Sequence, residues 1–553
     1  MWAKLHMSNK RMLYTICFFV LCLIDQRIKT VSGLSGWSES FRDLTGVVMA
    51  VLILSHYRLS DLGNHRRSYL IWTLICVAGG AVFLIKGQPL IFFLNNRIVL
   101  TLGVLLLGFA VLRTFFSVFR ERRKPCFNKG FSLAWLLMMA FMTVSRSGRL
   151  WPLVYLMIFG CFYLTDYTEA EQEDLFQGML NGIILGFFLM QGWCFAFRPY
   201  DAVRYVGVYN NSNLNALFYL VVLAAVLAKL LYVYRAECGR WIKIYYWLGT
   251  GTVLGFLFMT ISRTGWVSAI VLVIVALSAL TIINGRRSCI KKFITGGLTV
   301  ILCFCIALPL VFCAVRYLPP IFHHPVWFYG EWSENKVHSW DKWDSDKFIN
   351  ADKLLNTVSK RFAPIAETLF GTKNPGTEEA QAPIQVSPGS AEQGQQATSQ
   401  SEVSPLQQQL YDEALEAGFA IDPADKKDAV LFRVAIYRYY AHLLNFRGHP
   451  DSEQGFQILP NQRIGHAHNI YLQWGVDFGI PAMLLFIGLM IYSAVNLLKR
   501  FYSEKSEQPA GYLLFLMVPA VFGLLEYCWG AGSLTITLLF VIWRRMICNE
   551  TEQ

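Results

Sequence analysis

Residues 465–495 read GHAHNIYLQWGVDFGIPAMLLFIGLMIYSAV. A long polar segment precedes these residues, and an apolar run at 482–495 ends them. The imidazoles of His466 and His468 and the amide of Asn469 therefore stand where a polar loop enters a hydrophobic helix. Such groups are costly to dehydrate at a membrane. Their position predicts a functional site at the membrane surface, on the side of the long loop.

The composition is that of a membrane protein. Of the 553 residues, 55% are hydrophobic and 16% are charged, which is more hydrophobic than an ordinary soluble chain of this length. Apolar residues come in blocks of about 20, long enough to cross a hydrocarbon core of about 30 Å. The candidate spans are 12–24, 44–58, 70–86, 98–118, 131–145, 151–165, 179–197, 213–233, 244–262, 265–283, 293–315, 480–498, 511–527 and 533–547. The expected fold is all-α, a polytopic integral membrane protein with about 12–14 transmembrane helices.

The positive charges indicate the topology. The net charge is +12, and its Lys and Arg residues cluster in short loops between apolar blocks, a pattern that encodes orientation and gives no indication of nucleic-acid binding. The bias places both termini in the cytoplasm of a multi-pass protein of the cell membrane. Block 12–24 has no small-residue cleavage site after it, so we interpret it as a span and not as a signal peptide. The 13 cysteines lie mostly in apolar blocks and indicate no disulfide framework.

Three parts follow from this topology. Residues 1–316 form an N-terminal transmembrane bundle, 317–466 a large extracytoplasmic loop, and 467–553 the C-terminal transmembrane helices. Within the loop, about 372–409 is rich in Gln, Ser, Pro, Glu and Gly and has no aromatic residue. It cannot bury enough apolar surface to fold, so we expect it to be disordered. Apolar side chains at helical spacing predict a helix over 425–446.

Three arginines are expected on the outer side. Arg204 lies in a turn, Arg263 in the Ser262-Arg263-Thr264-Gly265 hairpin, and Arg433 on the loop helix. An outer arginine often extends toward lipid headgroups, but three that converge with His468 favour a cation cluster. The guanidinium fork binds phosphate through two parallel bonds, so the cluster predicts a phosphate site. The Ser145-Arg146-Ser147-Gly148-Arg149 turn is interpreted as a positioning or headgroup site.

His468 is the candidate general base, because an unperturbed imidazole is largely neutral at neutral pH. Two other interpretations stay open. His468 is a polar residue at a helix start that Asn469 caps, or it binds a metal together with His466, although no further ligands stand at a recognised spacing. The Asp344-Ser345-Asp346 triplet resembles a metal-binding motif of nucleotide-sugar transferases, but it is short and frequent by chance, so we interpret it as loop. We expect no metal and no other cofactor.

The order of these motifs is similar to that of a known family. An Arg-x-x-Gly-x-x-Asn-x-x-Asn turn from Arg204 to Asn213 comes first, and the Ser-Arg-Thr-Gly hairpin follows. A long loop then closes with the histidine motif, with ten residues between His468 and Gly479. Over residues 200–500 the chain resembles the O-antigen ligase and polysaccharide polymerase superfamily of bacterial membrane glycosyltransferases.

This resemblance implies a fold like that of GT-C membrane glycosyltransferases. It also implies a glycan donor carried on undecaprenyl pyrophosphate and transferred, without a metal, to a saccharide or lipid acceptor outside the cytoplasmic membrane. The implied site residues are His468 as base, Arg263, Arg433 and Arg204 for the pyrophosphate, and Asn213, His466 and Asn469 in support. Attack opposite the leaving group would invert the anomeric centre. The long insert and the number of spans exceed the usual family pattern, and polymerase and ligase activities are not distinguished.

A transporter or flippase of the same lipid-linked glycans is the alternative. It would carry charged residues along a path at mid-membrane. Such charges are scarce in the candidate spans, with Arg113 the main exception. A sensor or scaffold protein would explain the loop but not the arginines and His468. The sequence therefore favours the enzyme.

Overall fold

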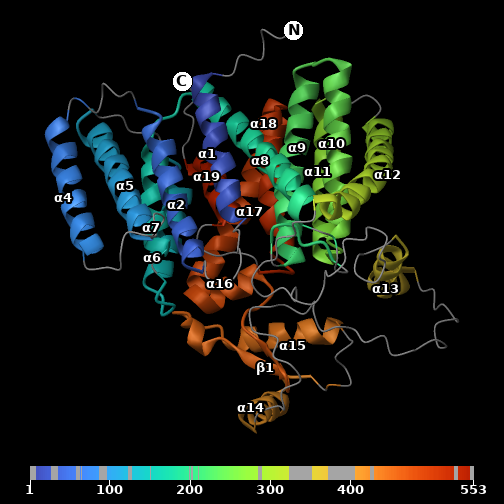
Figure 1. Ribbon diagram of the computed structural model, residues 1–553. Helices are drawn as coiled ribbons and strands as arrows, with labels where there is room; N and C mark the ends of the chain where they lie inside the picture. Colours follow the sequence, from blue (N-terminus) through green and yellow to red (C-terminus); the bar gives the residue numbers. More distant parts are fainter. Residues whose placement is uncertain are drawn as a thin grey trace.

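Figure 1 shows the computed structural model, a helical bundle with a smaller part at one end. The structure describes residues 8–26, 35–57, 63, 65–85, 96–121, 127–149, 151–198, 200, 204–209, 211–283, 285, 289–322, 351–370, 405–421, 423, 429–527 and 533–547. Within these residues the chain forms 18 α-helices and one pair of antiparallel strands. The helices are α1 (Asn9–Asp25), α2 (Ser35–Leu54), α4 (Arg66–Ile85), α5 (Asn96–Phe119), α6 (Lys129–Thr143), α7 (Trp151–Leu164), α8 (Glu169–Phe197), α9 (Ser212–Arg235), α10 (Arg240–Met259), α11 (Arg263–Ile283), α12 (Cys289–Phe322), α13 (Ala351–Phe370), α14 (Pro405–Glu416), α15 (Ala429–His442), α16 (Ile470–Phe478), α17 (Ile480–Glu504), α18 (Glu507–Phe522) and α19 (Leu534–Ile547). The strands are β1 (Phe456–Leu459) and β2 (Gln462–Ile464).

Each predicted span overlaps a helix within the described residues. Seven of the described helices are long and apolar enough to cross a membrane: α5 from Thr101 onward, α8, α9, α10, α11, α12 and α17. Shorter apolar helices lie at Leu44–Leu54, in α6 and in α7. The fold is thus nearly all helical, with the architecture of a multi-pass membrane protein. The total number of spans stays a prediction.

α9 is the central helix of the bundle. Almost all of it is buried, and it packs against α8, α10, α11 and α18. A helix with apolar residues on every side has no polar face to present, which explains this burial. On the flank, α1 packs closely against α8 at Gly182. A Cβ on Gly182 would lie 2.6 Å from the carbonyl oxygen of Thr15 and 2.7 Å from the Cβ of Phe18, so only glycine fits there.

A second, smaller hydrophobic core lies below the bundle in Figure 1, around α14, α15 and β1. Its two strands pair antiparallel, with Phe456 opposite Ile464. α16 connects this core to the bundle, because Val476 packs into the smaller core and Trp474 into the larger one. The buried residues of the smaller core include Tyr411, Ile436, Tyr440 and Ile458.

Two helices cross the predicted limits of the large loop and of its disordered segment. α12 continues past residue 317, through Pro319 and Pro320, to Phe322. Each proline lacks the N–H that would bond to the carbonyl four residues earlier, so this pair weakens the last turn of α12. α14 begins at Pro405, so the last five residues of the predicted disordered segment 372–409 are helical. Composition did not reveal this helix because its partners lie elsewhere in the chain. Residues 371–404 lie outside the described part.

The sequence suggested that the histidine motif leads directly into a membrane span. This prediction is wrong. The motif enters the short α16, which ends at Phe478, and α17 begins after a sharp bend. Gly479 makes this bend with a φ of +94°. A Cβ there would lie 2.2 Å from the carbonyl oxygen of Phe446. The predicted loop helix at 425–446 is confirmed in part as α15, which ends at His442, so residues 443–446 lie outside the helix.

Candidate active site

His468 lies directly before α16, in a backbone conformation that residues other than glycine rarely adopt. Its φ is +49°, and 2% of the residue is exposed. Asn469 caps the helix, because its side chain accepts hydrogen bonds from the backbone N–H groups of Tyr471 and Leu472. Its Nδ2 also donates to the carbonyl oxygen of Leu524 at 2.9 Å. The capping interpretation of Asn469 is confirmed, and this cap fixes the place where His468 enters the site.

Glu526 is the residue on which the site converges. It follows the end of α18 and is 5% exposed. Its Oε1 accepts hydrogen bonds from Nη2 of Arg433 and Nδ2 of Asn213, both at 2.9 Å. Its Oε2 lies 3.3 Å from Nδ1 of His468. Sequence reasoning missed Glu526, although a carboxylate at the end of an apolar block is a signal of such a site.

Arg433 joins α15 to the residues that follow α18. Its Nη1 donates to the carbonyl oxygen of Leu525 at 2.6 Å and lies 3.5 Å from that of His468. Together with the ion pair to Glu526, these contacts fix the guanidinium of Arg433, whose side chain is partly exposed, against the segment after α18.

Arg204 reaches the same site through Asn213. Its Nη2 donates to Oδ1 of Asn213 at 2.7 Å, and its Nε donates to the carbonyl oxygen of Thr260 at 3.0 Å. Asn213 in turn donates to Glu526. The predicted Arg–Asn turn is thus assembled around the carboxylate, with Arg204 one step away from it.

Arg263 is the first residue of α11. The Ser-Arg-Thr-Gly motif forms a helix start, in which Oγ of Ser262 accepts a hydrogen bond from the N–H of Gly265 at 3.2 Å. Within the part of the chain that the structure describes, the Arg263 guanidinium makes no hydrogen bond and no ion pair. It lies close enough to Arg433 for their charges to repel.

A fourth arginine, Arg361 on α13, was not foreseen. α13 is amphipathic, with Leu354 buried and Val358 packed against the main core. Arg361 follows at helical spacing on the same face. Burial lowers the pKa of the Arg361 guanidinium, the charges of Arg263 and Arg433 lower it further, and Glu526 acts in the opposite direction. Arginine nevertheless keeps its proton in proteins. Arg361 therefore lies within electrostatic range of Arg263, Arg433 and Glu526.

Among the residues that the structure describes, this cluster holds more positive than negative charge. Arg263, Arg361 and Arg433 interact electrostatically, and Glu526 is the carboxylate that acts on them among the described residues. The Nε of Arg361 is buried without a hydrogen-bond partner in the described part of the chain. Guanidinium groups held close together favour an anion between them. The arrangement can bind an anion beside a buried imidazole.

No family model, curated protein or solved structure matches this chain. Its functional interpretation rests on the residues themselves.

The remaining predicted site residues fall in different places. His466 is half-buried, with its ring 4.2 Å from that of His468 and 5.8 Å from that of Tyr527. The headgroup interpretation of Arg149 is wrong, because Arg149 forms an ion pair with the buried Asp477. Arg146, on the same turn, forms an exposed ion pair with Glu453 at 3.5 Å. The Asp344–Asp346 triplet lies outside the described residues.

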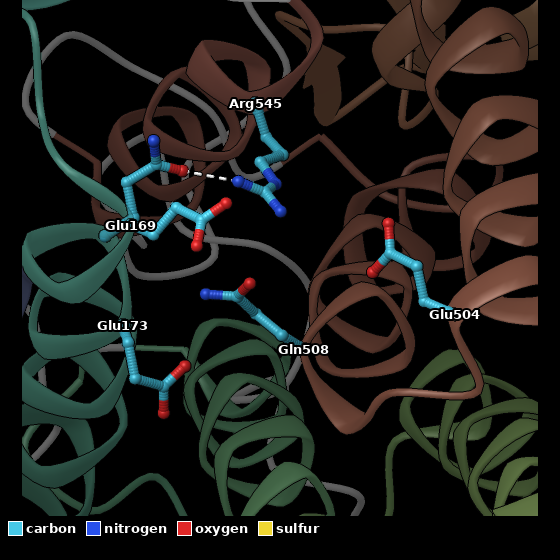
Figure 2. Close-up of a pocket in the computed structure, with 6 residues that line it drawn as sticks. Glu169, Glu173, Glu504, Gln508 and Arg545 are labelled. Atoms are coloured by element: carbon cyan, nitrogen blue, oxygen red, sulfur yellow. Dashed lines mark hydrogen bonds between the residues drawn. The ribbon is translucent and has the colours of Figure 1, made fainter. Parts of the chain in front are cut away.

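A cavity of about 290 Å³ lies at the opposite end of α18 (Figure 2). Figure 2 shows Glu169, Glu173, Glu504 and Gln508 around it, with Arg545 bonded to a glutamine side chain. Gln508 is in the first turn of α18, whereas Glu526 follows its last turn. This acidic cavity is therefore separate from the arginine cluster. An apolar cavity of about 420 Å³ lies between α6 and α17.

Proposed function

We propose that this chain transfers a glycan from undecaprenyl pyrophosphate to a saccharide or lipid acceptor at the extracytoplasmic face of the cell membrane. The observation that carries the proposal is the buried Glu526, whose carboxylate contacts both the guanidinium of Arg433 and Nδ1 of His468. Arg263 and Arg361 lie within electrostatic range of Arg433. The site lies at the end of the bundle next to the loop part, where a lipid carrier's headgroup is within reach. The motif order described above supports the identity of the donor.

The arginines would hold the donor diphosphate. Their excess positive charge suits a diphosphate diester, and each guanidinium fork can bind two phosphate oxygens in parallel. When the sugar leaves, negative charge grows on the pyrophosphate. Fixed positive groups in a partly dehydrated site stabilise that charge strongly.

His468 would activate the acceptor. Its Nε2 takes the proton of an acceptor hydroxyl while the oxygen forms a bond to the anomeric carbon. The bond from that carbon to the pyrophosphate oxygen breaks, and the lipid pyrophosphate leaves with the electron pair. Attack from the side opposite the leaving group inverts the anomeric centre. Glu526 stabilises the imidazolium that forms.

The alternative is transport of lipid-linked glycans, and the main sequence feature in its favour was the mid-span charge of Arg113. Arg113 is fully buried, and its two terminal nitrogens bind the carboxylate of Glu121 at 2.5 and 3.0 Å. Its guanidinium also lies 4.4 Å from the ring centre of Tyr57. These contacts give Arg113 a structural role, so it does not mark a path across the membrane.

The test is transfer by the full-length protein in lipid nanodiscs with a synthetic undecaprenyl-pyrophosphate donor. Consumption of the donor with an inverted product supports the proposal. Translocation of a labelled donor across proteoliposomes without transfer would replace it with the flippase. In a deletion strain, accumulation of single repeats on the lipid indicates a polymerase, and accumulation of long lipid-linked chains indicates a ligase.

A further inference from the structure

A buried ionic network joins the turn between α6 and α7 to the histidine motif. Asp477, in the last turn of α16, has no exposed surface. Its Oδ2 forms an ion pair with Nη1 of Arg149. Its Oδ1 accepts hydrogen bonds from the Nε2 atoms of Gln454 at 3.0 Å and Gln473 at 2.9 Å. Asp477 thus has the charge partner and the hydrogen bonds that a buried carboxylate needs.

The side chain of Gln473 connects Asp477 to the backbone beside His468. Its Nε2 donates to Asp477 at 2.9 Å and to Oε1 of Gln454 at 2.7 Å. Because both acceptors take the nitrogen, the amide oxygen must point the other way. That oxygen accepts the backbone N–H of Ala467 at 2.7 Å. The orientation of one amide therefore links the carboxylate of Asp477 to the backbone N–H of Ala467, the residue before His468.

The link matters because His468 is strained. A residue with a side chain and a φ of +49° keeps that conformation only where its surroundings impose it. The Ala467 N–H is fixed on one side of His468, and the Asn469 cap is fixed on the other. Between these two anchors the imidazole faces Glu526.

We propose that Asp477 is a positioning residue for His468, acting through Gln473 and anchored by Arg149. The Arg149 turn, from a part of the chain more than 300 residues earlier, then sets the geometry of the site. The expected loss of kcat rests on the proposed function, whereas the expected change in the backbone around His468 does not depend on it.

The test uses Gln473→Met in the full-length protein in nanodiscs. Methionine keeps the length of the side chain but removes the acceptor for the Ala467 N–H. Hydrogen–deuterium exchange of the 465–472 peptide, measured without any glycan, should speed up about tenfold. The matched control is Arg146→Gln, which breaks only the exposed pair to Glu453 and should leave this peptide unchanged. Unchanged exchange in Gln473→Met would overturn the proposal.

The kinetic readout separates positioning from mere folding. Misplaced catalytic groups lose about 100-fold in rate, so kcat should fall by about that factor while KM for the donor stays unchanged. A purely structural role would lower the amount of folded protein and leave kcat per folded molecule intact, which would overturn the proposal. If Gln473→Met does not fold, Arg149→Gln is the second variant. It removes the charge partner of Asp477 and should also speed up hydrogen–deuterium exchange of the 465–472 peptide. A wild-type protein without transfer would refute the proposed function. Exchange in Gln473→Met would still decide on the link to Ala467, and exchange in Arg149→Gln would decide on Asp477.

Discussion

The Nδ1 of His468 lies 3.3 Å from the Oε2 of Glu526, and both side chains are buried. A carboxylate in this position orients an imidazole and selects the tautomer with its proton on Nδ1. The lone pair that accepts a proton is then on Nε2. Arg433 holds the other oxygen of Glu526, so the carboxylate is itself fixed.

His468→Ala should reduce transfer by about 10²–10⁴-fold, the range that a general base contributes. Expression and membrane insertion should persist, because Asn469 still caps α16. The measurement is product formation per molecule of purified protein. His442→Ala, which changes an exposed histidine on α15, is the control and should retain activity. Wild-type activity in His468→Ala would remove the base assignment.

Glu526→Gln should separate catalysis from donor binding. The amide keeps the size of the side chain but loses the charge that stabilises an imidazolium, so kcat should fall at least about tenfold. The arginine cluster also loses its counter-charge, so the donor should bind as tightly as before or more tightly. Binding titrations with the lipid donor, beside kinetic assays, check both effects. Weaker donor binding with an unchanged kcat would contradict this role.

Deletion of residues 374–404 should preserve activity, because the composition of this segment does not favour folding. A deletion that extends through Glu416 removes Tyr411 and Ala414 from the smaller core and should abolish activity. Transfer assays on the two proteins, with size-exclusion profiles, make the comparison. Lost activity in the shorter, well-folded deletion would show that the segment binds a substrate or a partner.

Much of the fold could be predicted because apolar length reports directly on membrane-spanning helices. Apolar length did not predict that α16 and α17 are separate helices. The apolar residues of α16 run on toward α17, and only the backbone bend at Gly479 separates the two helices. α14 was missed for a different reason: its short apolar face finds partners in β1, far along the chain.

The candidate site was predictable in part. His468, Arg433 and the Arg204–Asn213 pair belong to compact motifs, and the structure brings them together. Glu526 and Arg361 belong to no motif, and each is recognisable only by its neighbours in space. Arg149 shows the converse, because its motif-like turn binds a buried carboxylate that spacing alone does not reveal.

Gly182→Ala should destabilise the protein, because a methyl group there meets the backbone of α1 at 2.6 Å. Overpacking of this kind costs about 1–3 kcal/mol. Gly192→Ala on the same helix is the matched control, since no atom lies within 4 Å of the added Cβ. Thermal unfolding in detergent should show a lower midpoint for the first variant only. Equal midpoints would contradict the close packing of α1 on α8.

The arginine cluster makes the most specific prediction. If Arg263, Arg361 and Arg433 hold one diphosphate, lysine cannot reproduce their paired bonds, so Arg→Lys at each position should raise KM for the donor and Arg→Ala should raise it more. Arg146→Ala, which changes an exposed ion pair, is the control and should have little effect. Activity should persist in EDTA, because guanidinium groups supply the positive charge. Loss of activity in EDTA that a divalent ion restores would contradict the metal-free mechanism and bring Asp344, Asp346 and His466 back as ligands. Near-normal kinetics in all three alanine variants would refute the arginine site even if His468 proved essential.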